Sequence, residues 1–254
     1  MKQVPSTTID IKHTARQTLQ KEASAVASLA QYIDKDFEDA VRMIAGCSGR
    51  TIVTGMGKSA IIAQKVVATF NSTGTASMFM HAGDAIHGDL GMIRPEDIVI
   101  CLSKSGESPE IKMLIPLLKN INAPLIAIVG NRDSFLAKQA LYILNTAVAE
   151  EACPNNLAPT SSTTAQLAMG DALAVCLMEF NGFSSDDFAK FHPGGTLGKM
   201  LYLKVSDLSS GNEQPRVLET SPLKKVIIEI TEKRLGVTAV VDEKDNLTGV
   251  ITDG

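Results

Sequence analysis

The sequence has no tryptophan, and aromatic residues make up only 4% of its 254 residues, so its core must be built from aliphatic side chains and alanine. No apolar run reaches the roughly 18 residues that a membrane-spanning helix needs, and Met1–Asp10 lacks the charged-then-apolar pattern of a secretion signal. The 24 basic and 28 acidic residues give a formal charge of −4, so there is no positive excess to attract nucleic acid or an anionic membrane. These absences predict a cytoplasmic protein without membrane or nucleic-acid partners.

Cysteine is also scarce. Cys47, Cys101, Cys153 and Cys176 are far apart and show no CxxC spacing. They therefore predict reduced thiols, and neither a zinc site nor a disulfide framework. The length suits one core of about 150–200 residues plus a smaller unit.

What the chain does contain is a series of short apolar runs, most of them followed by a turn of small residues and a helical pattern. Apolar runs without alternation are typical of strands covered on both faces, so they predict a parallel sheet in an α/β/α sandwich. The expected strands are Thr51–Thr54, Ala76–Met80, Asp97–Leu102, Leu125–Val129 and Leu141–Leu144.

Two helical patterns flank these runs. Thr14–Ala45 reads as a single amphipathic pattern, and Ser161–Phe180 as a buried helix. The expected buried face of the first pattern consists of Val26, Leu29, Ala30, Ile33, Phe37, Val41 and Ile44.

The composition changes after residue 208. A linker rich in Ser, Gly, Asn and Pro is followed by apolar runs at Val226–Thr231, Val237–Asp242 and Leu247–Thr252, with a hairpin-like turn before the last run. We expect a main domain over residues 1–208 and a linker with a small second unit over 209–254, too short to hold a core of its own. The chain stops directly after a predicted strand, which favours a piece of a longer protein.

The stretch TIVTGMGKSAIIAQK, residues 51–65, resembles two phosphate-binding patterns without completing either. A P-loop needs a glycine five residues before Gly57, where Ile52 stands. A dinucleotide-binding turn needs an acidic residue at the end of the second strand, whereas the first carboxylate there, Asp84, lies beyond a glycine. We therefore expect no nucleotide cofactor.

A second loop of glycine and serine follows the third expected strand. Hydroxyl groups at Ser103, Ser105 and Ser108, with Gly106 and a helix N-terminus, predict a cradle for a phosphate group. Helix capping by Ser108, ahead of Pro109, explains that serine alone. It does not explain the other three residues together.

These loops carry a resemblance to a known family. The motifs GMGKSA (55–60), HGDLGMI (87–93), SKSGESPE (103–110), APTSSTT (158–164) and HPGGTLGK (192–199) resemble the sugar isomerase (SIS) domain and, within it, the arabinose-5-phosphate isomerases. The resemblance covers about residues 14–208, and the tail resembles most of a first CBS motif. Lys104 stands where asparagine is usual, Ala82 and Asp84 replace the usual proline and glutamate, and no second CBS motif is present.

The resemblance implies an enzyme that interconverts ribulose 5-phosphate and arabinose 5-phosphate through a cis-enediol, for Kdo synthesis. It implies a homotetramer with sites shared between subunits, a small sugar phosphate as partner, and no cofactor. The implied catalytic residues are Lys58, Glu110, Glu151 and His192. The implied substrate-binding residues are Gly57, Ser59, His87, Ser103, Ser105, Gly106, Ser108, Ser161, Ser162 and Thr163.

The residue types fit that chemistry, which needs a base for a carbon-bound proton, a stabiliser for the enediolate oxygen and a grip on the phosphate. Glu110 or Glu151 would be the carbon base, and the sequence leaves this choice open. Lys58 offers a cation, and a neutral His192 could move a hydroxyl proton.

Several alternatives remain at this level. His81 and His87 with Asp84 and Asp89 suggest a metal, but the isomerisation requires none, and we expect His87 to contact a substrate hydroxyl with incidental zinc affinity. A non-catalytic sugar-phosphate sensor, or another SIS isomerase or lyase, is the rival function. The N-terminal segment has mixed charge and no basic recognition helix, which argues against a transcriptional sensor. Whether the product serves lipopolysaccharide or capsule, and whether the tail binds a nucleotide, stays open.

Overall fold

The computed structural model describes residues 9–209, 211 and 213–254. The chain divides into two compact units, Met1–Leu197 and Gly198–Gly254, each described by itself below. The predicted domain boundary after residue 208 stays a prediction. In the described ranges, no helix combines the length and the apolar character needed to cross a bilayer.

The first unit is built on a five-stranded sheet in which every neighbouring pair is parallel. This confirms the predicted fold class. The strands are β1 (Thr51–Gly55), β2 (Ser77–His81), β3 (Ile98–Ser103), β4 (Leu125–Val129) and β5 (Tyr142–Asn145), each within two residues of its predicted bounds.

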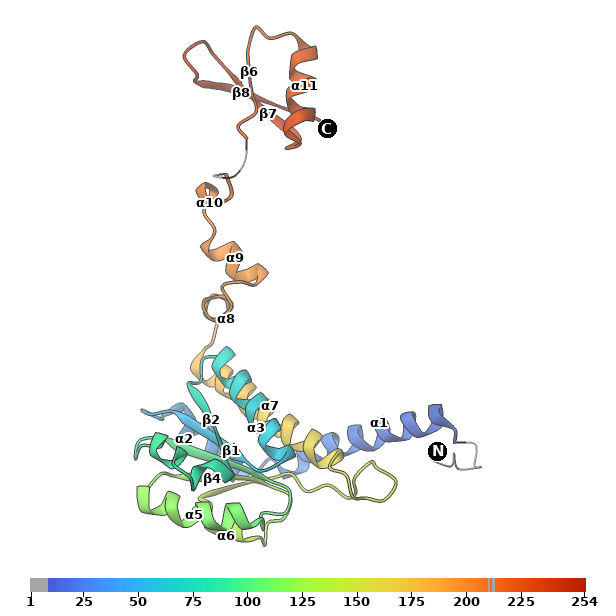
Figure 1. Cartoon of the computed structure of the whole chain (residues 1–254), viewed down its shortest axis with the longest axis vertical. Helices are drawn as coiled ribbons and strands as arrows, with labels where there is room; N and C mark the ends of the chain where they lie inside the picture. The colour runs from blue at the N-terminus through green and yellow to red at the C-terminus, as the bar shows by residue number, and fades with distance from the viewer. Residues whose placement is uncertain (1–8, 210, 212) are drawn as a thin grey trace. The chain divides into compact units, whose positions relative to one another are not determined.

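Helices cover both faces of this sheet, because its central strands are apolar on both sides. In β3, Ile98, Ile100 and Leu102 belong to one buried cluster, whereas Val99 and Cys101 belong to the other. Helices α3 (Lys58–Ser72) and α7 (Ser161–Asn181) lie side by side on the first face (Figure 1). The second face is covered by α4 (Ala82–Ala85), α5 (Pro109–Ile121) and α6 (Phe135–Gln139).

The strand order β2-β1-β3-β4-β5 creates a crevice at one edge of the sheet. The chain leaves β1 toward β2 on one side, whereas β3 lies on the other side of β1. The carboxyl ends of all five strands point to the same edge, and ligands of open α/β sheets bind where the strand order reverses. This topology places the turns after β1 and β3 next to each other.

The N-terminal segment differs from its prediction. It forms two helices, α1 (Ile11–Ser28) and α2 (Lys35–Ala45), separated by the 3₁₀ turn η1 (Leu29–Tyr32). The break is explained by Asp34, whose side chain accepts hydrogen bonds from the first-turn N–H groups of α2 and so begins a new helix. As a result Leu29, Phe37, Val41 and Ile44 are buried as predicted, whereas Val26, Ala30 and Ile33 are exposed.

The remaining elements of the first unit are the 3₁₀ turn η2 (Asp89–Met92) and helix α8 (Ser185–Phe191). Helix α9 (Thr196–Tyr202) spans the division between the units, and α10 (Val205–Ser209) follows it.

The second unit contains a three-stranded sheet in the order β6 (Arg216–Leu218), β7 (Val237–Val241) and β8 (Leu247–Thr252). The last two predicted runs form the antiparallel hairpin β7–β8, and Val226–Thr231 lies within helix α11 (Leu223–Lys233). A small cluster of Val217, Val226 and Ile230 is buried there. Several large apolar side chains of this unit stay exposed, among them Leu223, Ile227, Ile228, Leu247 and Val250.

Candidate active site

A cavity of about 310 Å³ opens at the crevice between the ends of β1 and β3. It brings together the predicted site residues Gly57, Lys58, Ser59, Ser103, Ser105, Ser108, Ser162 and Thr163. Met56, Lys104 and Pro159 also line it, although the sequence did not single them out as site residues. The lining therefore combines six hydroxyl side chains with two lysines, and no carboxylate is among these residues.

The turn after β1 begins helix α3 in an unusual way. Gly57 is the N-cap at φ +57°, a left-handed conformation that favours glycine, and it supplies no side-chain cap to the helix. The first N–H groups of a helix have no partner within it, and they carry the positive end of the helix dipole. Because Gly57, Lys58 and Ser59 all line the cavity, this helix start is arranged for an anion.

The loop after β3 forms the opposite wall and is shaped by its own serines. The Gly106 amide donates to Ser103 Oγ at 2.9 Å, and the Glu107 amide donates to Ser105 Oγ at 3.3 Å. Gly106 has φ +69°, and a Cβ there would collide with Ser134. Both serine hydroxyls accept within the loop, so each keeps its own O–H free to donate to a ligand.

Ser108 occupies the N-cap position of α5, but its side chain makes no capping hydrogen bond. Its Oγ is buried and has no partner among the described residues. The interpretation that capping explains Ser108 is therefore wrong. A buried hydroxyl without a partner beside a cavity is what a bound polar ligand would satisfy.

The third wall is the start of α7, which is held by Glu151. This carboxylate is 1% exposed and accepts from Ser162 Oγ at 2.5 Å, from the Ser162 amide at 3.1 Å and from the Thr160 amide at 2.8 Å. Thr160 Oγ1 lies 3.2 Å away, and Lys104 Nζ forms an ion pair with Glu151 at 2.6 Å. Glu151 thus fixes Thr160 and Ser162 and connects them to the turn after β3.

The electrostatics of Glu151 follow from these contacts. Burial raises the pKa of a carboxyl group, but here the hydrogen bonds from Lys104, from the Ser162 hydroxyl and from the two amides outweigh burial and lower the pKa of Glu151 to about 2. Glu151 is therefore ionised at neutral pH, and its oxygens are already occupied by donors. A catalytic role for Glu151 stays a prediction.

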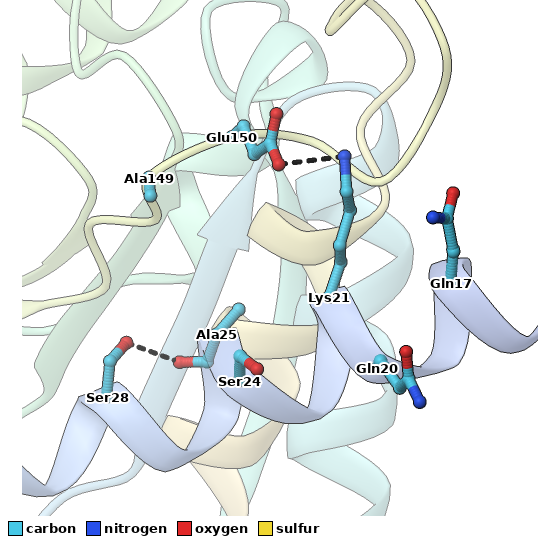
Figure 2. A pocket seen from close by; sticks show the side chains of 8 residues that line it. All are labelled: Gln17, Gln20, Lys21, Ser24, Ala25, Ser28, Ala149 and Glu150. Atoms are coloured by element: carbon cyan, nitrogen blue, oxygen red, sulfur yellow. Dashed lines mark hydrogen bonds and ion pairs between the residues drawn. The ribbon is translucent and has the colours of Figure 1, made fainter.

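The neighbouring Glu150 faces the other way. It is exposed and forms an ion pair with Lys21 of α1 at 2.8 Å (Figure 2). The cavity shown in Figure 2, of about 440 Å³, lies along α1 and residues 149–150. Its lining holds glutamines, serines and this neutralised ion pair. Its described lining residues offer an anion no unpaired cation and no helix N-terminus, so the cavity between β1 and β3 is the better candidate for an anion site.

Glu110 is the second residue of α5, one residue beyond Pro109. It is half-buried, and its carboxylate has no hydrogen-bond or ion-pair partner among the described residues. It does not line the cavity, but it follows Ser108 in the first turn of the same helix. Its carboxylate thus lacks the donors that occupy Glu151.

The remaining predicted residues are not part of the cavity lining. Gly106 and Ser161 are buried beside lining residues, and Ser161 Oγ has no partner among the described residues. His87 is exposed between α4 and η2, in the loop after β2, and so lies at the same edge of the sheet. Among the residues described, no cluster of three or more His, Cys, Asp and Glu side chains is placed to hold a metal ion.

His192 lies away from the cavity within one chain. It follows α8, stacks on Phe188 with ring centroids 3.9 Å apart, and its Nδ1 is 2.9 Å from the Phe188 carbonyl oxygen. Helix α7 starts at the cavity, and its 21 residues extend about 31 Å before α8 begins. Phe191 lies near Gly74, which precedes β2 at the opposite edge of the sheet. One chain therefore does not bring His192 to the other site residues.

Two lining residues could have been found from the sequence. Lys104 lies inside the serine loop, directly after β3, where every residue is a candidate for the crevice. Pro159 lies within the APTSSTT motif ahead of α7. Met56 carries no signal of its own beyond its position between two glycines.

Comparison with known proteins identifies the family of the chain. The SIS domain model matches residues 43–176. The arabinose 5-phosphate isomerase KdsD of Salmonella typhimurium is 49% identical over 96% of this chain and 75% of its own length, and that of Pseudomonas aeruginosa is 47% identical over 98% and 77%.

The chain belongs to the arabinose 5-phosphate isomerase family of SIS-domain proteins. One similar solved structure, c3406 of E. coli CFT073 in complex with A5P, is 38% identical, with 72% of this chain and 98% of the other chain covered, and has a TM-score of 0.70. The family match over residues 43–176 contains the turns after β1 and β3 and the start of α7.

Proposed function

We propose that this protein is an aldose–ketose isomerase that interconverts D-ribulose 5-phosphate and D-arabinose 5-phosphate, a step that feeds Kdo synthesis. The observation that carries this proposal is the cavity between β1 and β3. Two lysines, six hydroxyl side chains and the uncapped start of α3 surround it, as a phosphate dianion requires. The relatives with this activity match nearly the whole chain.

The reaction moves a proton between C1 and C2 through a cis-enediol. Glu110 removes the carbon-bound proton, because its carboxylate has no competing donors among the described residues, whereas Glu151 is saturated by hydrogen bonds. Lys58 stabilises the enediolate oxygen or the phosphate. The serines of the loop after β3 hold the phosphate.

Proton NMR in D2O tests this function. After incubation with D-ribulose 5-phosphate, the D-arabinose 5-phosphate formed should carry deuterium at C2, because the enediol is reprotonated by a group that exchanges with solvent. A sensor would bind the sugar phosphate without converting it. Another isomerase of this fold would convert a different ketose phosphate, so fructose 6-phosphate and sedoheptulose 7-phosphate serve as comparison substrates.

The site is completed by a second copy of the chain in a homotetramer. This proposal is supported by the position of His192. It lies beyond the end of α7, a helix that starts at the cavity and is roughly 31 Å long. The proposal is also supported by exposed apolar side chains on α1, where Ile11 is 76% and Leu19 is 67% exposed.

Mixed oligomers test this assembly. Lys58→Ala and His192→Ala should each be inactive alone, and mixed oligomers should recover part of the activity because some sites combine an intact Lys58 with an intact His192. The two variants carry different affinity tags, and purification over both tags in succession confirms that mixing has occurred. Confirmed mixed oligomers without any recovered activity would place both residues in the site of one chain.

The C-terminal residues 209–254 are a linker and part of a CBS motif, separate from the SIS domain over residues 1–208. The β6-α11-β7-β8 arrangement supports this assignment. We also place the enzyme in the cytoplasm, since all four cysteines are free thiols in the structure, as expected for a reducing compartment. Lipopolysaccharide and capsule are both compatible destinations of its product.

A further inference from the structure

Lys104 is one of the two lysines that line the cavity, and the proposed mechanism gives it no individual role. It directly follows β3, lines the cavity between β1 and β3, and its side chain is 48% exposed. It also lines a neighbouring cavity of about 240 Å³ together with Ser105, Asn131 and Thr146. Its ammonium group therefore lies on a wall that a ligand in the crevice would meet.

The ammonium group of Lys104 is held in place by an ion pair with the buried Glu151. Its Nζ lies 2.6 Å from Glu151 Oε1, and Glu151 is itself fixed by Thr160 and Ser162. A lysine has three N–H donors, and Glu151 is the acceptor that the described residues provide for one of them. The other two donors remain available to a ligand in the cavity.

The two cavity lysines flank the point where the strand order reverses. Gly55 of β1 lies beside Leu102 of β3 in the sheet register. Lys58 is three residues after Gly55, and Lys104 is two residues after Leu102. A phosphate monoester carries about 1.5–2 negative charges at neutral pH, which two cations on opposite sides neutralise better than one.

We propose that Lys104 is a substrate-contacting residue that binds the phosphate group, and that Glu151 is the positioning residue that holds the Lys104 ammonium at the cavity wall. The identity of the substrate rests on the proposed function; the anion-binding role of Lys104 does not. The competing explanation is that Lys104 only neutralises the buried charge of Glu151.

The experiment measures inorganic phosphate affinity by calorimetry and KM and kcat with D-arabinose 5-phosphate. Lys104→Met should weaken phosphate binding and raise KM by roughly 10- to 100-fold, the size of one charge-assisted hydrogen bond, with kcat within about threefold. Lys104→Arg should restore most of both. Lys112→Met is the matched control, because Lys112 pairs with Glu107 at 2.6 Å but does not line the cavity.

Unchanged phosphate affinity and KM in Lys104→Met, together with a lower melting temperature, would show that Lys104 only neutralises Glu151 and would overturn the proposal. A loss confined to kcat would overturn it too, since phosphate binding acts on KM. If Lys104→Met does not fold, the double variant Lys104→Gln/Glu151→Gln removes both charges. Its phosphate affinity and KM are then compared with those of Glu151→Gln alone. If the wild type does not isomerise the sugar phosphate, the proposed function fails, while the inorganic phosphate measurement still decides the role of Lys104.

Discussion

The two compact units use their apolar and polar residues in different ways. The first unit covers both faces of its sheet, with one buried cluster on each side. The second unit has one small buried cluster, of Val217, Val226 and Ile230, and leaves several large apolar side chains of its helix and hairpin exposed. A sheet buries its apolar faces against other elements, and only the first unit does this on both faces of its sheet. The first unit is therefore the one that can hold catalytic side chains in fixed positions.

The polar groups follow the same division. In the first unit, polar side chains lie together at one edge of the sheet. Glu151 is buried there, and Ser108 Oγ has no hydrogen-bond partner among the described residues. In the second unit, the contacts Arg216–Asp245 and Lys244–Asp242 lie on the surface, and the buried Thr238 lies within a strand, not at the edge of a sheet. Catalysis should therefore depend on the first unit and be nearly independent of the second.

The largest effect is expected in the first unit at Glu110. Glu110→Gln keeps the shape of the side chain but removes the base, so kcat should fall by roughly 10²–10⁴ with a smaller change in KM. Steady-state kinetics with D-ribulose 5-phosphate measures this, and Glu150→Gln is the control for an exposed carboxylate. If Glu151→Gln is the inactive variant and Glu110→Gln is close to wild type, the roles of the two glutamates are reversed. If neither variant loses activity, the enediol assignment is wrong.

A smaller effect is expected at the phosphate cradle. Ser105→Ala removes one hydroxyl donor to the phosphate, a charge-assisted hydrogen bond worth about 1.5–3 kcal/mol, so KM should rise by roughly 10- to 100-fold. Ser72→Ala, at the far end of α3 where the hydroxyl bonds to Thr69, should leave KM unchanged. An equal KM in both variants would remove Ser105 from the site.

Glu151 should affect stability and its dependence on pH. Glu151→Gln places an amide N–H2 group opposite hydrogen-bond donors, which should lower the free energy of unfolding by about 1–3 kcal/mol. Because the pKa of Glu151 is lowered from 4.5 to about 2 in the folded state, its contribution is present above pH 4.5 and is lost as the pH falls toward 2.

Urea unfolding of the wild type and of Glu151→Gln at several pH values measures this difference. The gap in stability between the two proteins should be largest near neutral pH and should close as the pH falls. A gap that does not change with pH would show that the carboxylate of Glu151 is not held by the contacts with Lys104 and α7. Glu150→Gln, next in the chain but exposed, should show no such gap.

The smallest effect is expected from removing most of the second unit. Deletion of residues 209–254 should leave kcat/KM within about threefold, roughly 0.6 kcal/mol in barrier height. Light scattering of the shortened protein confirms that the oligomer is intact. A larger loss of activity in an intact oligomer would mean that the second unit takes part in the site, and the comparison between the units would then fail.

Much of the first unit could be predicted from the sequence. The five strands follow from continuous apolar runs, because a strand that is buried on both faces has apolar side chains at successive positions. The serine loop after β3 also stands out, because hydroxyl groups and a glycine gather where a helix begins. The break between α1 and α2 was missed because the apolar spacing continues through it, and only the capping bonds of Asp34 reveal the new start.

The sequence by itself determined the parallel sheet, the turns after β1 and β3, and the types of residue that a phosphate would need. Tertiary structure alone decided how those residues are used. Glu150 and Glu151 are adjacent and chemically identical, but one pairs with Lys21 on the surface, and the other is buried beneath Lys104. Burial and hydrogen-bond partners come from segments distant in the chain, and they set the pKa of a carboxylate. The packing of distant segments also places His192 away from the cavity of its own chain.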